Sequence, residues 1–168
     1  MNYRPKKVAV LGSGVMGSGI ACHLANVGMD VIMLDIVTPG LSDNDSKNNF
    51  HRNKLVNSAL QKTIKSKPAP LYHKSFTSRI KTGNFEDDFD KISESDWIIE
   101  VVVENLEIKK QIFEKVDKHR KNGSLVSSNT SSIPINLLAQ DCSDDFKSCF
   151  CGTHFFNPVR YLKLLEII

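Results

Sequence analysis

The sequence predicts an α/β fold of the Rossmann type: a doubly wound, mostly parallel sheet with a helical insertion after the second strand. Apolar runs of strand length alternate with segments of helical periodicity along the 168 residues, which indicates parallel strands joined by helical crossovers. A glycine-rich turn separates the first strand from the first helix, and the second strand ends in a carboxylate. These features predict one dinucleotide-binding domain over residues 1–168.

The first strand and the turn after it carry most of this prediction. Val8–Leu11 is an apolar run typical of a buried parallel strand. In the Gly-x-Gly-x-x-Gly pattern that follows, Gly12 permits the tight turn, Gly14 lets a pyrophosphate approach the backbone, and Gly17 lets the helix pack on the strand. The helix continues to Gly28, and its first turn offers unpaired N–H groups to phosphates. The cofactor-binding candidates of this turn are Gly12, Gly14, Val15, Met16 and Gly17.

The second strand, Asp30–Asp35, predicts which dinucleotide binds. Asp35 stands 23 positions after Gly12, close to the ~20 expected of a residue that binds the adenosine ribose. A carboxylate accepts hydrogen bonds from a 2′-hydroxyl and repels a 2′-phosphate, and the next residues, 36–38, include no arginine, so NAD is favoured over NADP. The alternative is a glycine-rich turn in another kind of α/β protein, with Asp35 only ending a strand.

A polar, turn-rich loop over residues 38–45 leads into the predicted insertion, a helix over Ser46–Ser66. Apolar residues at three- and four-residue steps give this helix one apolar face. Its other face is basic, with Arg52, Lys54, Lys62 and Lys65. A solvated helix face is the favoured interpretation, and attraction of a polyphosphate group on the substrate is the alternative.

The remaining elements follow in the order expected of alternating strands and helices. Pro68–Pro70 ends the insertion. A cluster of hydroxyls and an amide, Ser127–Ser132, follows the fifth strand, where it either binds a ligand at the carboxyl edge of the sheet or caps the next helix. The predicted elements are a strand at Arg79–Gly83, a short helix at Phe85–Asp90, a strand at Trp97–Val103, a helix at Leu106–Arg120, a strand at Ser124–Val126, a short helix at Ile135–Ala139, and strands at Phe150–Phe156 and Leu162–Ile168.

His154 and Glu166 are the candidate catalytic pair. They lie on the last two predicted strands, which are joined by a turn at Asn157–Arg160, so a hairpin-like return could bring them together. A neutral imidazole could take the proton of a substrate hydroxyl, and a neighbouring carboxylate would orient the ring. The apolar run around Glu166 makes an unpaired carboxylate there costly to bury. A structural, hydrogen-bonded core histidine is an equally weighted alternative.

Composition excludes several other classes of protein. The net charge of +3 is small and dispersed, which argues against nucleic-acid binding, and no apolar run approaches the ~20 residues of a membrane helix. The segment Met1–Lys7 lacks the features of a secretory signal, so we expect a cytoplasmic protein with reduced cysteines. Cys149, Cys151 and His154 could suggest a metal cluster, but the sequence offers no second ligand pair, and we predict no metal site.

Several blocks together resemble the NAD-binding domain of the L-3-hydroxyacyl-CoA dehydrogenases of fatty-acid β-oxidation. The resemblance covers nearly the whole chain. The two blocks most specific to that family are Asn129–Ser132 and His154–Pro158. The other matching blocks are Gly12–Gly17, Val103–Asn105 and Lys163–Ile168.

The resemblance implies a role for each matching residue. His154 would be the general base, Glu166 its orienting partner, and Ser131 the donor to the substrate's 3-oxygen. The helical insertion would help to grip coenzyme A, which gives Lys62 and Lys65 more weight. The residues that would hold NAD include Asp35 at the adenosine ribose and, along the nicotinamide half, Glu104, Lys109 and Asn129.

The resemblance also implies the reaction: oxidation of an L-3-hydroxyacyl-CoA to the 3-ketoacyl-CoA with NAD. Family members continue into a helical second domain that closes the substrate cleft and usually dimerises, so we expect this chain to be an amino-terminal fragment that binds NAD but turns over poorly. In some bacterial relatives the dehydrogenase is followed by an enoyl-CoA hydratase-like portion. The alternatives are a non-catalytic dinucleotide-binding module and a dehydrogenase for a free small hydroxy acid.

Overall fold

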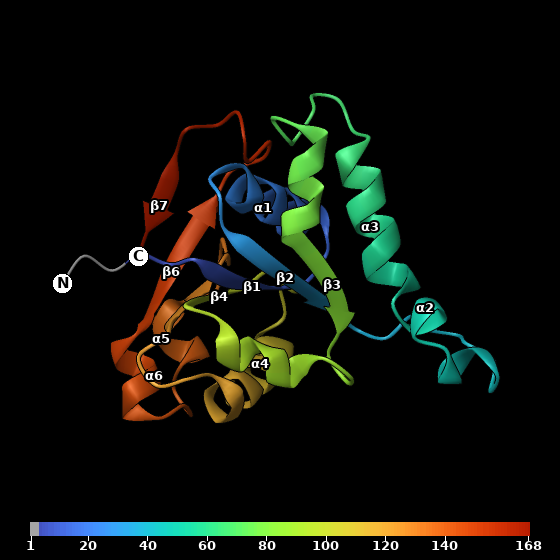
Figure 1. Ribbon diagram of the computed structural model, residues 1–168. Helices are drawn as coiled ribbons and strands as arrows, with labels where there is room; N and C mark the ends of the chain where they lie inside the picture. Colours follow the sequence, from blue (N-terminus) through green and yellow to red (C-terminus); the bar gives the residue numbers. More distant parts are fainter. Residues whose placement is uncertain (1–3) are drawn as a thin grey trace.

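A computed structural model describes residues 4–168 of the chain as one sheet covered by helices on both faces (Figure 1). The first three residues of the segment Met1–Lys7 lie outside the described residues. The strands run in the spatial order β3-β2-β1-β4-β5-β6-β7, and all neighbours are parallel except β6 and β7. This is the strand order of doubly wound dinucleotide-binding sheets, so the predicted fold class is confirmed. The strands are β1 (Lys7–Leu11), β2 (Asp30–Asp35), β3 (Ile80–Asn84), β4 (Trp97–Glu100), β5 (Leu125–Ser128), β6 (Phe150–Phe155) and β7 (Leu165–Ile167).

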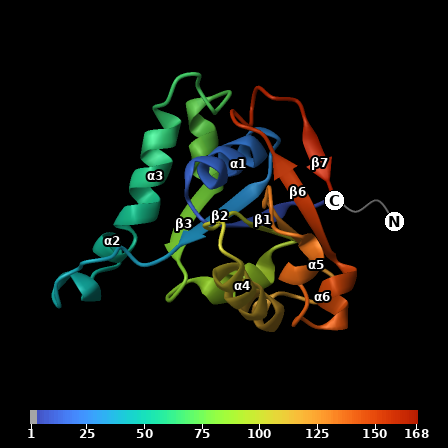
Figure 2. The same cartoon turned by 180° about the vertical axis from the view of Figure 1, so that it is seen from behind.

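The helices form two layers. Helices α1 and α3 lie on one face of the sheet and α4, α5 and α6 on the other, as the views from front and back agree (Figures 1 and 2). The helices are α1 (Val15–Asn26), α2 (Asn49–Arg52), α3 (Lys54–Ile64), α4 (Leu106–His119), α5 (Ile135–Leu138) and α6 (Asp144–Ser148), with 3₁₀ turns η1 (Asp45–Lys47), η2 (Lys74–Arg79) and η3 (Phe89–Glu94).

The apolar run in β1 is continuous because both faces of that strand are covered. Val8 and Val10 pack into the core beneath α1 and α3, whereas Ala9 and Leu11 pack into the core beneath α4. All four side chains are fully buried. A central parallel strand buries alternate residues on opposite faces, so it has no polar face to alternate with.

The turn after β1 depends on two glycines. Gly12 has a φ of +112°, and a Cβ there would lie 2.5 Å from the carbonyl oxygen of Val101. A Cβ on Gly17 would lie 2.0 Å from the carbonyl oxygen of Gly12, closer than any side chain tolerates. Helix α1 therefore rests directly on the backbone of the turn, as the pattern predicted for its first and third glycines.

The insertion after β2 differs from the predicted single helix. The continuous helical segment is α3, and α2 stops before it at Asn53. Thr38 causes the break: its backbone N–H and its hydroxyl both donate to the carbonyl of Arg52, and the hydroxyl accepts from Leu55 N at 2.9 Å. These are the backbone groups that a continuous helix would have used, so a tertiary contact overrides the helical periodicity.

Two strand predictions were too long, and one short helix was misplaced or missed at each end of the chain's middle. Strand β4 stops at Glu100 because its neighbours β1 and β5 also end there, at Leu11 and Ser128. Strand β7 pairs only over Leu165–Ile167, and its residues are exposed. The helix predicted at Phe85–Asp90 is the 3₁₀ turn η3 that begins at Phe89, and α6 was not predicted.

We expect Gly17→Ala to destabilise the domain by about 2 kcal/mol or more, because its methyl group would collide with backbone that cannot move without displacing α1. Urea denaturation measures the change. Gly14→Ala is the matched control: a Cβ there meets nothing within 4 Å, so its free energy of unfolding should change by less than about 1 kcal/mol. Equal losses in the two variants would contradict the prediction.

Candidate active site

A cleft of about 1140 Å³ opens at the carboxyl ends of the parallel strands. It lies where the strand order reverses, between β1 and β4, which is the ligand-binding position of open α/β sheets. The glycine turn forms one wall, and the segments that follow β4, β5 and β6 form the others. Of the predicted site residues, only Gly17, beneath the turn, and Glu166, behind His154, do not line it. Those that do are Gly12, Gly14, Val15, Met16, Asp35, Glu104, Lys109, Asn129, Ser131 and His154.

The glycine turn and Asp35 lie side by side at one end of the cleft. One oxygen of the Asp35 carboxylate accepts from the backbone N–H of Ser13 at 2.6 Å and from its hydroxyl at 2.5 Å. The other oxygen accepts from Ile36 N at 2.7 Å. Space is open beside Gly14, where a Cβ would meet nothing within 4 Å. This arrangement fits a dinucleotide, with room for a pyrophosphate at the helix N-terminus and a carboxylate beside it for ribose hydroxyls.

His154 and Glu166 are cross-strand neighbours in the β6–β7 hairpin. His154 Nδ1 lies 2.8 Å from Glu166 Oε2, so the carboxylate accepts the Nδ1–H and leaves Nε2 as the proton acceptor. The His154 side chain is 21% exposed and packs against the ring of Phe156, with 4.5 Å between ring centroids. Glu166 is half exposed, so the burial that its apolar neighbours suggested does not occur.

Glu104 holds the turn that carries Ser131. Its Oε1 accepts from the Thr130 hydroxyl, from Ser131 N at 3.1 Å, and from the backbone and hydroxyl of Ser132. Its Oε2 pairs with the ammonium of Lys109 at 3.2 Å. Partial burial raises the pKa of Glu104, but the hydrogen bond from Thr130 and the charge of Lys109 outweigh it and lower the pKa to about 2.

Sequence reasoning missed Glu100, the last residue of β4. Its side chain is fully buried, and Lys109, also buried, donates to both of its oxygens at 2.7 and 3.0 Å. Burial raises the pKa of Glu100, and the charge of Lys109 opposes that shift. A carboxylate inside the apolar run Trp97–Val103 was the available signal, because a buried charge requires a partner.

Asn129 joins the ends of two strands. Its Oδ1 accepts from Phe155 N at 2.9 Å, and its own backbone N–H donates to the carbonyl of Glu100 at 2.9 Å. The side chain is therefore fixed beside His154 on the floor of the cleft. Both interpretations of the hydroxyl cluster at Ser127–Ser132 find support, since this segment lines the cleft and Thr130 Oγ1 also accepts from Ile133 N.

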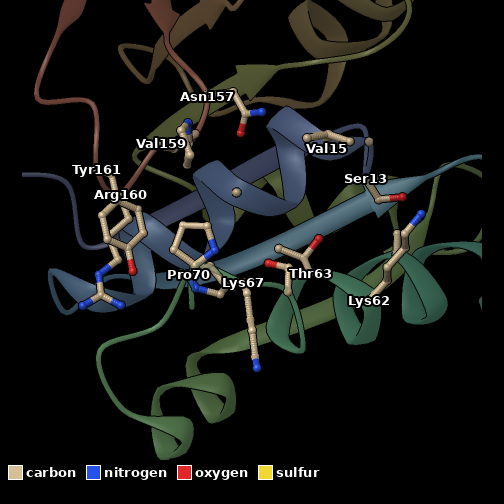
Figure 3. A pocket seen from close by; sticks show the side chains of 16 residues that line it. Ser13, Val15, Lys62, Thr63, Lys67, Pro70, Asn157, Val159, Arg160 and Tyr161 are labelled. Carbon is tan, nitrogen blue, oxygen red and sulfur yellow. The ribbon is translucent and has the colours of Figure 1, made fainter.

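A second cavity of about 460 Å³ lies on the other side of the glycine turn, between α1, the end of α3 and the loop after β6 (Figure 3). Lys62 and Lys67 line it, whereas Lys65 does not. Arg160 donates to the carbonyls of Ala69 and Leu71 at 2.7 and 3.0 Å, which ties the end of the insertion to the loop after His154. The two cavities share Ser13, Gly14, Val15 and Asn157.

The described residues give no sign of the other classes that the sequence raised. Within residues 4–168, no group of three or more His, Cys, Asp or Glu side chains is placed to hold a metal ion. Cys151 lies in β6, but Cys149 lies before it, at the end of α6. No helix in the same range is long and apolar enough to span a bilayer.

The fold and the cleft define a dinucleotide-binding domain with a histidine–carboxylate pair at its edge. Residues 7–168 match the family described as "3-hydroxyacyl-CoA dehydrogenase, NAD binding domain". Because the match covers nearly the whole chain, the chain belongs to this family, and its cofactor is NAD.

Known proteins of this kind are longer than the chain. A probable 3-hydroxyacyl-CoA dehydrogenase of Bacillus subtilis is 58% identical over 100% of the chain and 22% of its own length. A putative fatty acid oxidation complex trifunctional enzyme of Rickettsia felis is 44% identical over 100% of the chain and 22% of its own length. The crystal structure of (S)-3-hydroxybutyryl-CoA dehydrogenase PaaH1 from Ralstonia eutropha superposes with a TM-score of 0.71 at 33% identity, covering 98% of the chain and 54% of that enzyme.

We expect Gly14→Ala to weaken NAD binding at least about tenfold while leaving the fold intact. The added methyl group would stand in space that is open in the protein but needed by the pyrophosphate, and overpacking of this kind costs about 1–3 kcal/mol. Isothermal titration calorimetry with NAD measures the change. Gly40→Ala is a control outside the cleft lining, and an unaltered NAD affinity in Gly14→Ala would exclude this position for the phosphates.

The lowered pKa of Glu104 predicts a pH-dependent contribution to stability. A carboxyl group whose folded-state pKa is about 2, below the ordinary 4.5, stabilises the fold above pH 4.5, and that contribution disappears as the pH falls towards 2. The wild-type chain should therefore exceed Glu104→Gln in free energy of unfolding at pH 7, with the difference shrinking below pH 4.5. Urea denaturation at several pH values measures it, and a constant difference from pH 7 to pH 3 would contradict the assignment.

Proposed function

We propose that this chain supplies the NAD-binding part and the catalytic base of an enzyme that oxidises an L-3-hydroxyacyl-CoA to the 3-ketoacyl-CoA in fatty-acid β-oxidation. The observation that carries the proposal is the hydrogen bond between His154 and Glu166, with the imidazole on the wall of the cleft that begins at the glycine turn. The names of the Bacillus and Rickettsia relatives support the substrate class and the pathway.

The proton transfer follows from the direction of the imidazole. Glu166 accepts the Nδ1–H of His154, so Nε2 is unprotonated and takes the proton of the substrate's 3-hydroxyl. When bound, NAD supplies the acceptor for the hydride that leaves the same carbon, and the carbon–oxygen bond becomes a ketone. Glu166 then stabilises the positive charge that His154 has gained.

Ser131 would bind the substrate oxygen on which the proton is lost. Its backbone N–H is held by Glu104, whose carboxylate remains ionised at neutral pH, and the residue lines the same cleft as His154. A hydroxyl in this position can donate a hydrogen bond to the 3-oxygen as it becomes a carbonyl. Glu104, Lys109 and Asn129 would lie along the nicotinamide half of NAD, and Asp35 at the adenosine ribose.

Two alternatives remain distinguishable by experiment. In a non-catalytic dinucleotide-binding module, the His154–Glu166 pair would be structural, but a partly exposed imidazole on a cleft wall is a poor choice for a structural core histidine. A dehydrogenase for a free small hydroxy acid would show no preference for the coenzyme A ester. We further propose a cytoplasmic location, and homodimerisation through parts of the complete protein beyond this domain.

We expect His154→Gln to lower kcat by ~10²–10⁴-fold in the complete protein, because the general base is lost while the size of the side chain is nearly kept. The measurement is steady-state oxidation of a 3-hydroxyacyl-CoA with NAD. His119→Gln, on the far end of α4 and outside the cleft lining, is the matched control. Unchanged turnover in His154→Gln would favour the non-catalytic module.

The 168-residue chain by itself should bind NAD and yet turn over poorly, because the cleft lacks the wall that a second domain supplies in complete enzymes of the family. Titration with NAD and a steady-state assay on the same preparation test both halves of this expectation. A turnover close to that of the complete protein would contradict the second half.

A further inference from the structure

We infer that Glu100 is a positioning residue for the cofactor side of the cleft. It does not line the cleft itself. Instead it holds Lys109 and the end of β5 in place from beneath. The inference rests on NAD binding, which the family establishes, and is independent of the dehydrogenase reaction proposed above.

The carboxylate of Glu100 gathers donors from separate segments of the chain. Lys109 in α4 donates to both of its oxygens, at 2.7 and 3.0 Å. Val102 N, in the segment after β4, donates at 2.7 Å, and the hydroxyl of Ser128, at the end of β5, donates at 2.5 Å. One buried side chain therefore fixes a helix, a loop and a strand end relative to one another.

Lys109 extends this arrangement to the surface of the cleft. Its ammonium lies 2.7 Å from Glu100 and 3.2 Å from Glu104. Glu104 in turn binds the turn that contains Ser131, and Ser128 immediately precedes Asn129. Two carboxylates that share one ammonium thus hold both ends of the segment that carries Asn129 and Ser131.

The energetic cost of this arrangement argues for a role beyond stability. Removing a carboxylate and an ammonium from water is costly, and a buried ion pair often contributes no more stability than well-packed apolar residues of the same volume. Its value here is direction: Glu100 fixes where the Lys109 ammonium lies, and without that anchor the long side chain would be free to move towards Glu104 or into the cleft.

A comparable ion pair at the opposite edge of the sheet provides a control. Arg120, at the end of α4, is buried and pairs with Asp145. It also packs near Ser124, at the start of β5, whereas the cleft lies at the carboxyl end of that strand. Breaking either ion pair removes a partner from a buried cation, but only one of them lies beneath the cleft.

The test compares Glu100→Gln with Asp145→Asn in the 168-residue chain. Calorimetric titration gives the dissociation constant of NAD, and urea denaturation gives the stability of each variant. We expect NAD to bind about tenfold more weakly to Glu100→Gln and within twofold of wild type to Asp145→Asn. An unchanged affinity in Glu100→Gln, or an equal loss in both variants, would overturn the inference.

A double-mutant cycle tests whether Glu100 acts through Lys109. Lys109→Met and the double variant Glu100→Gln/Lys109→Met are titrated with NAD in the same way. If Glu100 serves to hold the ammonium, the double variant should bind NAD about as weakly as Lys109→Met alone, whereas additive losses would overturn this route.

Ser128→Ala covers the case in which Glu100→Gln does not fold. It removes one hydrogen bond to Glu100 and leaves Lys109 paired. We expect a two- to fivefold loss of NAD affinity, about the effect of one hydrogen bond, with the fold retained, and an affinity equal to wild type would overturn the inference. If the wild-type chain binds NAD but the complete protein lacks dehydrogenase activity, the proposed function fails and this inference stands.

Discussion

The close approach of α1 to the turn after β1 is the constraint on which the rest of the structure depends. With no side chain on Gly17, the helix rests on the carbonyl of Gly12, and the positive φ of Gly12 turns the chain directly from strand into helix. The N-terminus of α1 is thereby held at the carboxyl end of the central strand, where the strand order reverses. A cleft, exposed helical N–H groups and the carboxylate of Asp35 then share one small region, which is what a dinucleotide needs.

The antiparallel pairing of β6 and β7 supplies the other half of the site. Parallel neighbours need a long crossover, so residues close in sequence cannot face one another on adjacent parallel strands. A hairpin removes that restriction, and it sets His154 opposite Glu166. The reversal occurs at the edge of the sheet, which explains how a parallel dinucleotide fold acquires a short-range imidazole–carboxylate pair beside its ligand cleft.

Between these two features lies a network of charges that the apolar sheet would not otherwise contain. Glu100 and Lys109 are buried, and Glu104 connects them to the cleft surface. The network joins β4, β5 and α4 at the carboxyl edge only. The glycine turn and the hairpin are thus linked by a rigid floor, with Asn129 bonded to both β4 and β6.

The sequence by itself determined the fold class, the glycine turn, Asp35 and the proximity of His154 to Glu166, because these depend on local patterns: buried strand runs, glycine spacing and a turn between two strands. Only the tertiary structure decided where the elements end. Thr38 divides the helical insertion through contacts from a distant loop, and β4 stops where its neighbours stop. The role of Glu100 was also hidden, since its partners lie in separate segments and only folding brings their charges and hydroxyls within hydrogen-bonding distance.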